Sequence, residues 1–360
     1  MLNTKMIGSK IVEARKKINI SQARLAEQLF ISPQAVGKWE RGESMPDIIT
    51  LNRLAEILKV DLNYFSENPS LESTEIEAAI PDMTQMDEMP SIKKEKKLIW
   101  DMSNGSWVDT DFSGLKNLHE KFSSSNMQKC LFIGSEMSGL LLKNNNVEGC
   151  DFSNSDMGSS HIQNSHLLNN TFRNTSLEEA EFSKSYVKGC DFSDAHFKGV
   201  NLQKSSYIEG CNFSHSDFGN SRIFNSYLSD NIFTACSLQE TEFSESHISE
   251  CDFTGADFTG VVIKSGGLEK SIFTKATWKA TSFYATQLAD LVFEGTLEDC
   301  SFENCSFKKV IFQNTTLINT FFKNNNLKRV QFINCKVDKI TYAFLKNGKA
   351  DLTEVTILTL

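Results

Sequence analysis

The chain has 360 residues, of which 40% are hydrophobic, so it is long enough to form two domains with buried cores. Its formal net charge is −9, but residues 1–70 carry ten basic against eight acidic side chains, whereas residues 71–105 carry four against eight. The N-terminal part is therefore the better candidate for binding a polyanion. Because the first residues lack an apolar signal segment and no run of 18 apolar residues occurs, we expect a cytoplasmic protein that has no membrane partner.

Residues 7–66 have apolar side chains at helical spacing and predict a small helical domain. Four helices are expected: residues 7–18, one that starts after Ser21, one that starts after Ser32, and residues 48–58. Serine is suited to the N-cap position, Pro33 fits the first helical position, and Gly42 fits the end of the third helix. Two short helices joined by a tight turn are typical of a helix-turn-helix unit.

The segments SQARLAEQLFISPQAVGKWERGESMPD and LNRLAEILKV resemble the XRE family, which includes Cro and the phage repressors. The resemblance implies that residues 1–67 form a DNA-binding domain whose third helix enters the major groove. It implies an ion pair between Arg15 and Glu40 at the edge of the core. It also implies a packed face between the second and third helices, made of Leu25, Ala26, Val36 and Trp39.

The same resemblance, with the Ser32 cap, gives the residues expected at the DNA: Gln22, Ser32, Pro33, Gln34, Gly37, Lys38 and Arg41. Gln34 can pair with adenine, and Lys38 can reach guanine. Gln22 matches a residue that contacts a phosphate at a helix N-terminus, and Arg41 is expected to contact a phosphate too. Direct readout of bases is expected to be sparse, because a proline and a glycine in this set have no side-chain donor. The alternative is a helix-turn-helix domain that binds a protein.

Residues 68–105 have the composition of a flexible linker. They contain three prolines and many acidic residues, followed by the basic run Lys93–Lys97. The basic run could contact DNA without sequence preference, although a solvated charged segment is the simpler interpretation.

From Phe112 to Tyr342 a large apolar residue, here called a centre, recurs every five positions with Asn117 as the exception, and a small residue typically lies two positions before it. A period of five fits neither a helix nor a strand, but it fits a square solenoid with one repeat on each side. The phase slips near Tyr207, where one residue is inserted, and between Phe293 and Leu297, where one is lost. If four repeats make one coil, one stacked column is entirely phenylalanine: Phe112, Phe132, Phe152, Phe172, Phe192, Phe213, Phe233, Phe253, Phe273, Phe293, Phe312 and Phe332.

Segments such as CDFSD-AHFKG-VNLQK and CDFTG-ADFTG resemble the pentapeptide-repeat family. The resemblance implies that residues 106–342, regular over 112–342, form a right-handed quadrilateral β-helix. About twelve coils at the ~4.8 Å strand spacing give a rod roughly 55 Å long. The expected fold class is thus an all-α helix-turn-helix domain joined to an all-β solenoid.

All nine cysteines occupy the small position two residues before a centre, so we expect each to be a small buried residue. They are Cys130, Cys150, Cys190, Cys211, Cys236, Cys251, Cys300, Cys305 and Cys335. No C-x-x-C spacing indicates a metal site, no motif indicates catalysis, and we expect neither a cofactor nor an enzyme.

The residue just before each centre should point outward. On one side of the rod these residues form an aromatic stripe in five consecutive coils: His166, Tyr186, Tyr207, Tyr227 and His247. The stripe is either a surface for a protein partner or a ladder of side chains that stack on the solenoid. Residues 343–360 leave the five-residue pattern, end apolar, and are expected to cap the rod or to form a dimer contact.

These observations favour a sequence-specific transcriptional regulator that binds double-stranded DNA as a homodimer on a two-fold site. The rod would bind an unidentified protein partner, dimerise or sense a signal. The alternative is a protein-interaction or DNA-mimic rod that acts on DNA gyrase or a similar enzyme, because acidic rods of the pentapeptide-repeat family include such mimics. That alternative depends on a column of aspartates, Asp111, Asp151, Asp191 and Asp252, which apolar residues interrupt.

Overall fold

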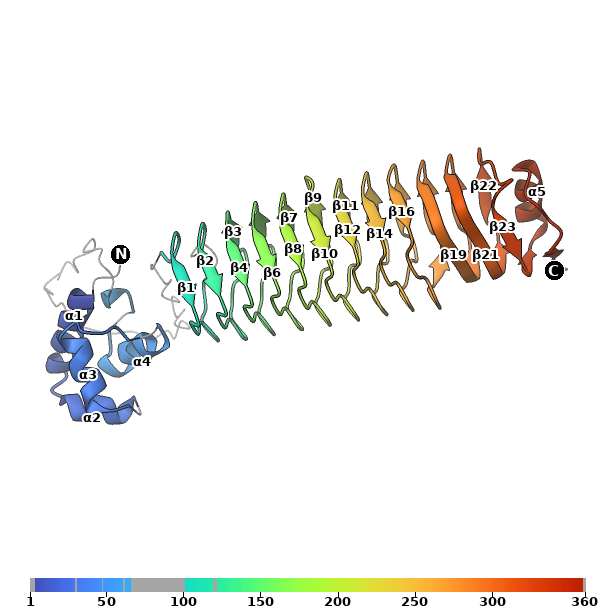
Figure 1. The fold of residues 1–360 in the computed structure, drawn as a ribbon. Coiled ribbons are helices and arrows are strands. Elements are labelled where there is room, and N and C mark those ends of the chain that lie inside the picture. The colour runs from blue at the N-terminus through green and yellow to red at the C-terminus, as the bar shows by residue number, and fades with distance from the viewer. Residues whose placement is uncertain are drawn as a thin grey trace, which may run out of the picture. The chain divides into compact units, whose positions relative to one another are not determined.

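The computed structural model forms two compact units, residues 1–100 and 101–360, which are considered separately (Figure 1). It describes residues 4–29, 31–46, 48–60, 62–65, 101–118 and 122–358. Most of the predicted linker lies outside the described residues. Its last residues, 101–105, belong to the second compact unit, where Met102 is buried.

The first unit is a helical domain, as predicted. Its elements are α1 (Thr4–Lys17), α2 (Gln22–Gln28), α3 (Pro33–Glu40), α4 (Ile48–Leu58) and the 3-10 helix η1 (Leu62–Phe65). Ser21 and Ser32 cap α2 and α3: the Ser21 hydroxyl accepts a hydrogen bond from the Arg24 amide at 3.1 Å, and the Ser32 hydroxyl accepts one from the Ala35 amide at 3.3 Å. The first helix begins at Thr4, three residues before the predicted start at residue 7.

The core of this unit requires small residues where helices cross. Leu25, Ala26 and Val36 are fully buried between α2 and α3, as predicted. Gly8 of α1 lies against the end of α3, and a Cβ atom there would lie 2.3 Å from the Trp39 carbonyl oxygen. A larger residue at position 8 would therefore push α1 away from α3.

The second unit is a four-sided parallel solenoid (Figure 1). One side is a 15-stranded sheet made of β1 (Ser106–Val108), β2 (Asn126–Gln128), β4 (Asn146–Glu148), β6 (His166–Leu168), β8 (Tyr186–Lys188), β10 (Tyr207–Glu209), β12 (Tyr227–Ser229), β14 (His247–Ser249), β16 (Gly267–Glu269), β17 (Trp278–Lys279), β19 (Gln287–Glu298), β21 (Ser306–Ile318), β23 (Gln331–Ile333), β24 (Cys335–Val337) and β25 (Val355–Ile357). Another side is a ten-stranded sheet made of β3 (Leu141–Lys143), β5 (His161–Gln163), β7 (Glu181–Ser183), β9 (Asn201–Gln203), β11 (Arg222–Phe224), β13 (Glu242–Ser244), β15 (Val262–Lys264), β18 (Ser282–Tyr284), β20 (Ser301–Glu303) and β22 (Phe321–Lys323). Up to Thr277 the other two sides are ladders of isolated parallel bridges, and beyond it β17, β19, β21 and β23 of the 15-stranded sheet extend onto them.

The register of these sheets confirms a coil of 20 residues and both slips of phase. Tyr207 pairs with Tyr227, 20 residues later, but with Tyr186, 21 residues earlier. The inserted residue lies at a corner, where Lys204 and Ser205 both have positive φ. The lost residue lies in β19, whose pairing with β21 shifts between Phe293 and Gly295. There the chain passes three sides as one continuous strand, visible as a long arrow in Figure 1.

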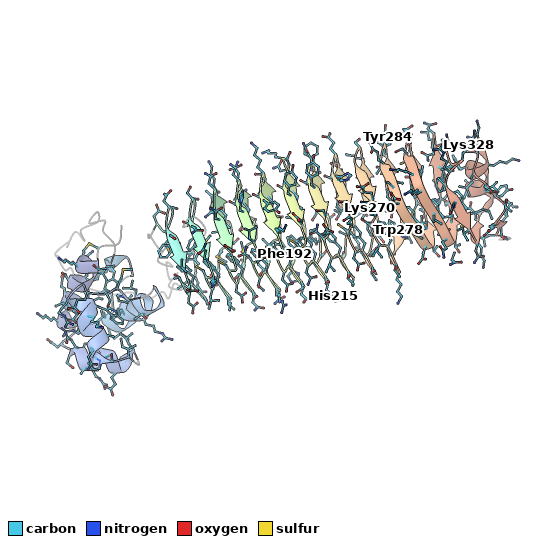
Figure 2. All side chains as sticks on the ribbon, viewed as in Figure 1. Phe192, His215, Lys270, Trp278, Tyr284 and Lys328 are labelled. Carbon is cyan, nitrogen blue, oxygen red and sulfur yellow. The ribbon has the colours of Figure 1, made fainter. Side chains whose placement is uncertain are left out.

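Stacked aromatic rings fill the interior of the rod. The twelve phenylalanines of the predicted column stack on one another, with neighbouring ring centroids 4.6 to 5.9 Å apart. The spacing of the coils thus sets the spacing of the rings. Phe192 and Trp278 are each 1% exposed, whereas Tyr284 and Lys328 point to solvent (Figure 2).

The small inward position holds a cysteine, a small apolar residue such as Ala180 or Ala256, or a polar residue, and many of the polar residues form hydrogen bonds within the core. The hydroxyl groups of Ser135, Thr175 and Thr241 donate to the carbonyl oxygens of Phe112, Phe152 and Phe218, each 23 residues earlier, at 2.7 to 2.8 Å. These bonds link successive coils, so polar side chains in this position need no water. All nine cysteines are buried and free, in the predicted position.

The C-terminal residues close the rod with a helix and a final strand. Helix α5 (Lys339–Asn347) is capped by Asp338, which accepts a hydrogen bond from the Thr341 amide at 2.7 Å. The repeat pattern was therefore extended too far: Tyr342, predicted as a centre, lies in this helix. Leu345 is fully buried, and the Phe344 ring packs edge-on against Phe321 of β22 at 5.4 Å. Strand β25 then pairs with β24 in parallel.

Within the described parts of both units, no helix has the length and apolar character that a membrane crossing requires.

Candidate nucleic-acid interface

Helix α3 turns one face to solvent and the other to the core. Pro33, Gln34 and Lys38 are exposed, while Val36 and Trp39 are buried against the rest of the domain. Residues four positions apart share a face of a helix, so Gln34 and Lys38 lie on one outward surface, and Pro33 precedes Gln34 at the start of the helix. Its polar members, an amide and an ammonium group, are able to hydrogen-bond to base edges.

A network of three side chains joins the start of α2 to the end of α3. Arg15 of α1 binds Glu40 through two nitrogens, at 2.5 and 3.0 Å, and donates to the Ile20 carbonyl at 2.8 Å. Gln22 donates from its amide nitrogen to the same Glu40 carboxylate at 2.6 Å. The predicted Arg15–Glu40 pair is thus present, and it extends to Gln22, which holds that side chain at the N-terminus of α2.

The network also fixes the charge of Glu40. Burial by itself would raise the pKa of this carboxyl group, but the hydrogen bonds from Arg15 and Gln22 outweigh burial and hold the pKa below its ordinary value. The Glu40 side chain is only 6% exposed. The Arg15–Glu40 pair therefore fixes how α1 and α3 meet, because removal of either partner would leave the other as an unpaired buried charge.

Gly37 and Arg41, both predicted to lie at the DNA, are in close contact with each other. Gly37 is buried, because the Arg41 side chain folds back over it: a Cβ at Gly37 would lie 3.1 Å from Arg41 Nη1 and 3.9 Å from Gln22 Oε1. Glu43 accepts hydrogen bonds from Arg41 Nε at 2.6 Å and Nη2 at 3.1 Å. Glu43 was not among the predicted site residues, although an acidic residue two positions after an arginine is a signal for such a pair.

The five residues of the aromatic stripe pair with one another across successive coils, but their side chains make different contacts. Tyr207 and Tyr227 stack with ring centroids 4.7 Å apart and are 47% and 44% exposed. Tyr186 instead donates its hydroxyl to Glu209 at 2.8 Å, and His247 lies 3.3 Å from Glu269. Glutamates of the next coil thus contact two members of the stripe, whereas Tyr207 and Tyr227 stack on each other.

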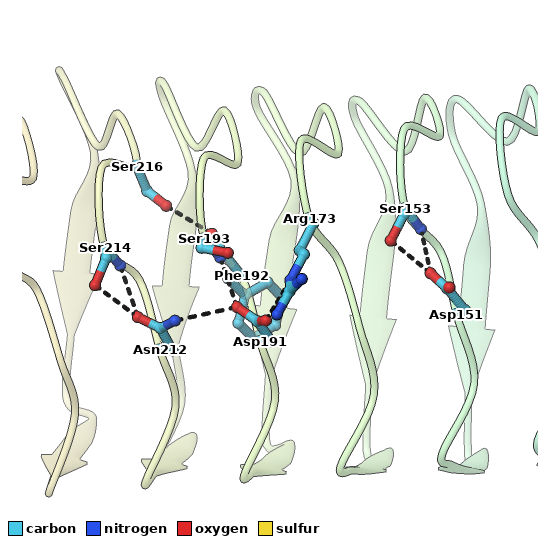
Figure 3. A network of polar contacts seen from close by, with 9 residues as sticks. All are labelled: Asp151, Ser153, Arg173, Asp191, Phe192, Ser193, Asn212, Ser214 and Ser216. Carbon is cyan, nitrogen blue, oxygen red and sulfur yellow. Dashed lines mark hydrogen bonds and ion pairs between the residues drawn. The ribbon is translucent and has the colours of Figure 1, made fainter.

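The aspartates of the acidic column have a role in the turns of the solenoid. Asp151 accepts two hydrogen bonds from Ser153, one from its amide at 2.9 Å and one from its hydroxyl at 2.5 Å (Figure 3). Asp191 accepts from the Ser193 amide at 3.1 Å and forms an ion pair with Arg173 at 2.5 Å (Figure 3). Such side chain-to-backbone bonds stabilise tight turns. Both carboxylates are therefore engaged within the rod.

Comparison with known proteins identifies both units. Residues 11–65 match the family model described as helix-turn-helix, and residues 175–206 and 226–264 match the model described as pentapeptide repeats (8 copies). The ImmF control region 10 kDa protein of Bacillus phage phi105 is 33% identical over 63 residues, which are 18% of this chain and 70% of that protein. The chain joins an XRE/Cro-type helix-turn-helix domain to pentapeptide repeats. Residues 264–342 also match the model of the SV2A/B/C luminal domain.

Other relatives of this helix-turn-helix pentapeptide-repeat protein are similar over the same N-terminal residues. The Bacillus subtilis protein YonR, a prophage-derived uncharacterized transcriptional regulator of helix-turn-helix type, is 37% identical over 59 residues, 16% of this chain and 55% of YonR. Repressor protein C2 of Salmonella phage P22 is 35% identical over 63 residues, 18% of this chain and 29% of the repressor. The chain therefore spans about half of YonR and under a third of the P22 repressor.

Solved structures similar to the solenoid include two pentapeptide-repeat proteins. HetL from the cyanobacterium Nostoc, which is involved in heterocyst differentiation regulation, is 15% identical with a TM-score of 0.22, over 52% of this chain and 89% of HetL. QnrB1, a plasmid-mediated fluoroquinolone resistance protein, is 17% identical with a TM-score of 0.30, over 62% of this chain and 91% of QnrB1.

Proposed function

We propose that this protein is a sequence-specific transcriptional regulator that binds double-stranded DNA through α3. The observation that carries the proposal is the outward surface of α3, where Gln34 and Lys38 are exposed beside the capped helix start at Ser32. The Arg15–Glu40–Gln22 network supports it, because it holds the N-terminus of α2 at the edge of the same surface. A cytoplasmic location is consistent with this role and remains an expectation.

Gln34 provides the direct test. The full-length protein is first used to select bound duplexes from a random pool, which defines the preferred sequence. We expect Gln34→Ala to weaken binding to that duplex by about 1–3 kcal/mol and to relax the preference at one base position, because a glutamine can pair bidentately with adenine. Failure of the wild-type protein to select any sequence would contradict the function, and an unchanged footprint of the variant would contradict the role of Gln34.

The rod is proposed to join two copies through its C-terminal end. Strand β25 is the last strand of its sheet, and two apolar side chains of the C-terminal segment, Ile340 of α5 and Ile357 of β25, are 53% and 40% exposed. An end strand with apolar neighbours favours association with a second chain. For such a dimer we expect a two-fold DNA site with half-sites about 34–36 Å apart, one helical turn of DNA. The stacked Tyr207–Tyr227 pair is proposed instead as a contact for an unidentified protein partner.

The DNA-mimic alternative receives less support from the surface of the rod. A mimic presents free negative charge along its length, whereas Asp151 and Asp191 are engaged in turn hydrogen bonds and one of them in an ion pair. Ile232 and Ile272, 43% and 54% exposed, interrupt the same column. Inhibition of gyrase supercoiling by residues 101–360 alone would restore the alternative.

A further inference from the structure

Gly37, in the middle of α3, has no side chain to cover the helix surface. The side chain of Arg41, the residue directly after α3, lies over this position. Gly37 lies one turn after Pro33 and one turn before Arg41, so the three positions share a face with Gly37 in the middle. A helical side chain covers the turn N-terminal to its own Cα, and Arg41 follows this rule by lying over Gly37. A side chain at position 37 would need the space that the guanidinium occupies.

The carboxylate of Glu43 holds this guanidinium in one orientation. It accepts from Nε and Nη2, which leaves Nη1 and the outer hydrogen of Nη2 without a partner in this clamp. Two parallel donors at the end of an arginine match the O6 and N7 acceptors of guanine, the commonest specific contact in the major groove. A phosphate contact requires no such clamp, because a phosphate accepts donors from many directions.

We propose that Arg41 reads a guanine in the major groove across Gly37, with Glu43 as the residue that positions it. This inference rests on the proposed function, since it assigns base readout to a residue that the sequence analysis assigned to a phosphate. It also changes how the interface reads sequence. Gly37 has no side-chain donor, and for that reason direct base readout was expected to be sparse. In this proposal the absence of a side chain at Gly37 instead leaves space for Arg41, which can make the commonest specific base contact.

The test uses the full-length protein and the duplex selected by the wild type, with each base pair of a half-site changed in turn. The affinity for each duplex is measured by fluorescence anisotropy at fixed salt. We expect the wild type to prefer guanine at one position by about tenfold or more. In Arg41→Lys this preference should largely disappear while the preferences at other positions remain. In Gly37→Ala the added methyl group should shift the guanidinium by a few tenths of an ångström and reduce the same preference.

Glu43→Gln distinguishes the role of Glu43 in orienting Arg41 from the effect of its negative charge on DNA affinity. Loss of a carboxylate near the DNA should increase affinity for all duplexes, while the guanine preference decreases because the arginine is no longer held. Arg24→Lys is the matched control: Arg24 forms a similar exposed ion pair with Glu27 at 2.5 Å, and this variant should keep the guanine preference. All variants should show wild-type thermal unfolding.

Three results would overturn the proposal. Arg41→Lys could weaken binding equally to every duplex and lower the salt dependence by about one phosphate contact, which would make Arg41 a phosphate ligand. Gly37→Ala could keep the full preference, which would remove Gly37 from the readout. Glu43→Gln could leave the preference unchanged, which would remove the clamp. A wild-type protein that selects no duplex contradicts the proposed function before any variant is measured.

Discussion

A single residue, Glu40, links three helices of the helical unit. Glu40 binds both Arg15 and Gln22, so one carboxylate connects α1, α2 and α3. Because hydrogen bonds and ion pairing hold its folded pKa below the ordinary value, Glu40 contributes stability that is present above about pH 4.5 and is lost as pH falls through the folded pKa. The position of Gln22, a predicted DNA contact, therefore depends on a buried charge.

Glu40→Gln should destabilise residues 1–70 by about 2 kcal/mol at pH 7, because it removes charge-assisted hydrogen bonds from a buried position. The difference from the wild type should shrink as the pH falls from 5 to 3. Urea unfolding followed by the fluorescence of Trp39, the one tryptophan in these residues, measures both effects. Glu27→Gln, which alters an exposed ion pair, is the control and should change stability little. An equal effect of both variants at every pH would contradict this account.

At the scale of elements, each short helix depends on its cap. Helices α2 and α3 have seven and eight residues, too short to be stable alone, and each begins with a serine whose hydroxyl accepts an amide hydrogen bond. Ser32 has two assignments, because it caps α3 and is also predicted to contact DNA. The two serines therefore form a natural pair for comparison.

Ser21→Ala and Ser32→Ala should each reduce the stability of residues 1–70 by about 1 kcal/mol, the usual contribution of an N-cap serine. If Ser32 also contacts DNA, only Ser32→Ala should weaken binding to the selected duplex under conditions where both variants are fully folded. Equal affinities of the two variants would limit Ser32 to capping. Chemical denaturation and anisotropy titrations on the same samples give both quantities.

At the scale of the whole molecule, each unit has its own core. The helical unit is therefore proposed to bind DNA, and the rod is proposed to make protein contacts. The helical unit buries its apolar residues between crossing helices, whereas the solenoid buries stacked rings along its axis. A solenoid coil contacts only its neighbours, so its ends and outward side chains are the places available to partners. The two candidate surfaces on the rod are the C-terminal end and the stacked tyrosine pair.

Two double variants of the full-length protein distinguish these surfaces. Ile340→Ser with Ile357→Ser should convert a dimer into a monomer, because it removes apolar side chains beside the final strand. Tyr207→Ser with Tyr227→Ser should leave the mass unchanged, since this pair is assigned to a different partner. Sedimentation equilibrium measures the mass of both. A wild-type monomer, or dissociation caused only by the tyrosine changes, would contradict the assignment.

The fold followed closely from the sequence because its signals are local or strictly periodic. The period of five identified the sides, and the phenylalanine column at period 20 identified the coils before any pairing was known. The same reasoning extended the repeat into α5, because Tyr342 keeps the spacing although Asp338 starts a helix there. The spacing of apolar residues predicts where centres recur. It does not predict that an N-cap residue such as Asp338 starts a helix and ends the repeat.

The sequence by itself determined the two domain types, the core of the rod, the cysteine positions and both helix caps, since each depends on the backbone period or on neighbours along the chain. Only the tertiary structure decided which outward side chains are free. Glu209, one coil further on, binds Tyr186, and Arg41 folds back over Gly37 while Glu43 holds it. These contacts depend on side-chain rotamers and on coils that the fold brings together. The spacing of residues along the sequence predicts neither.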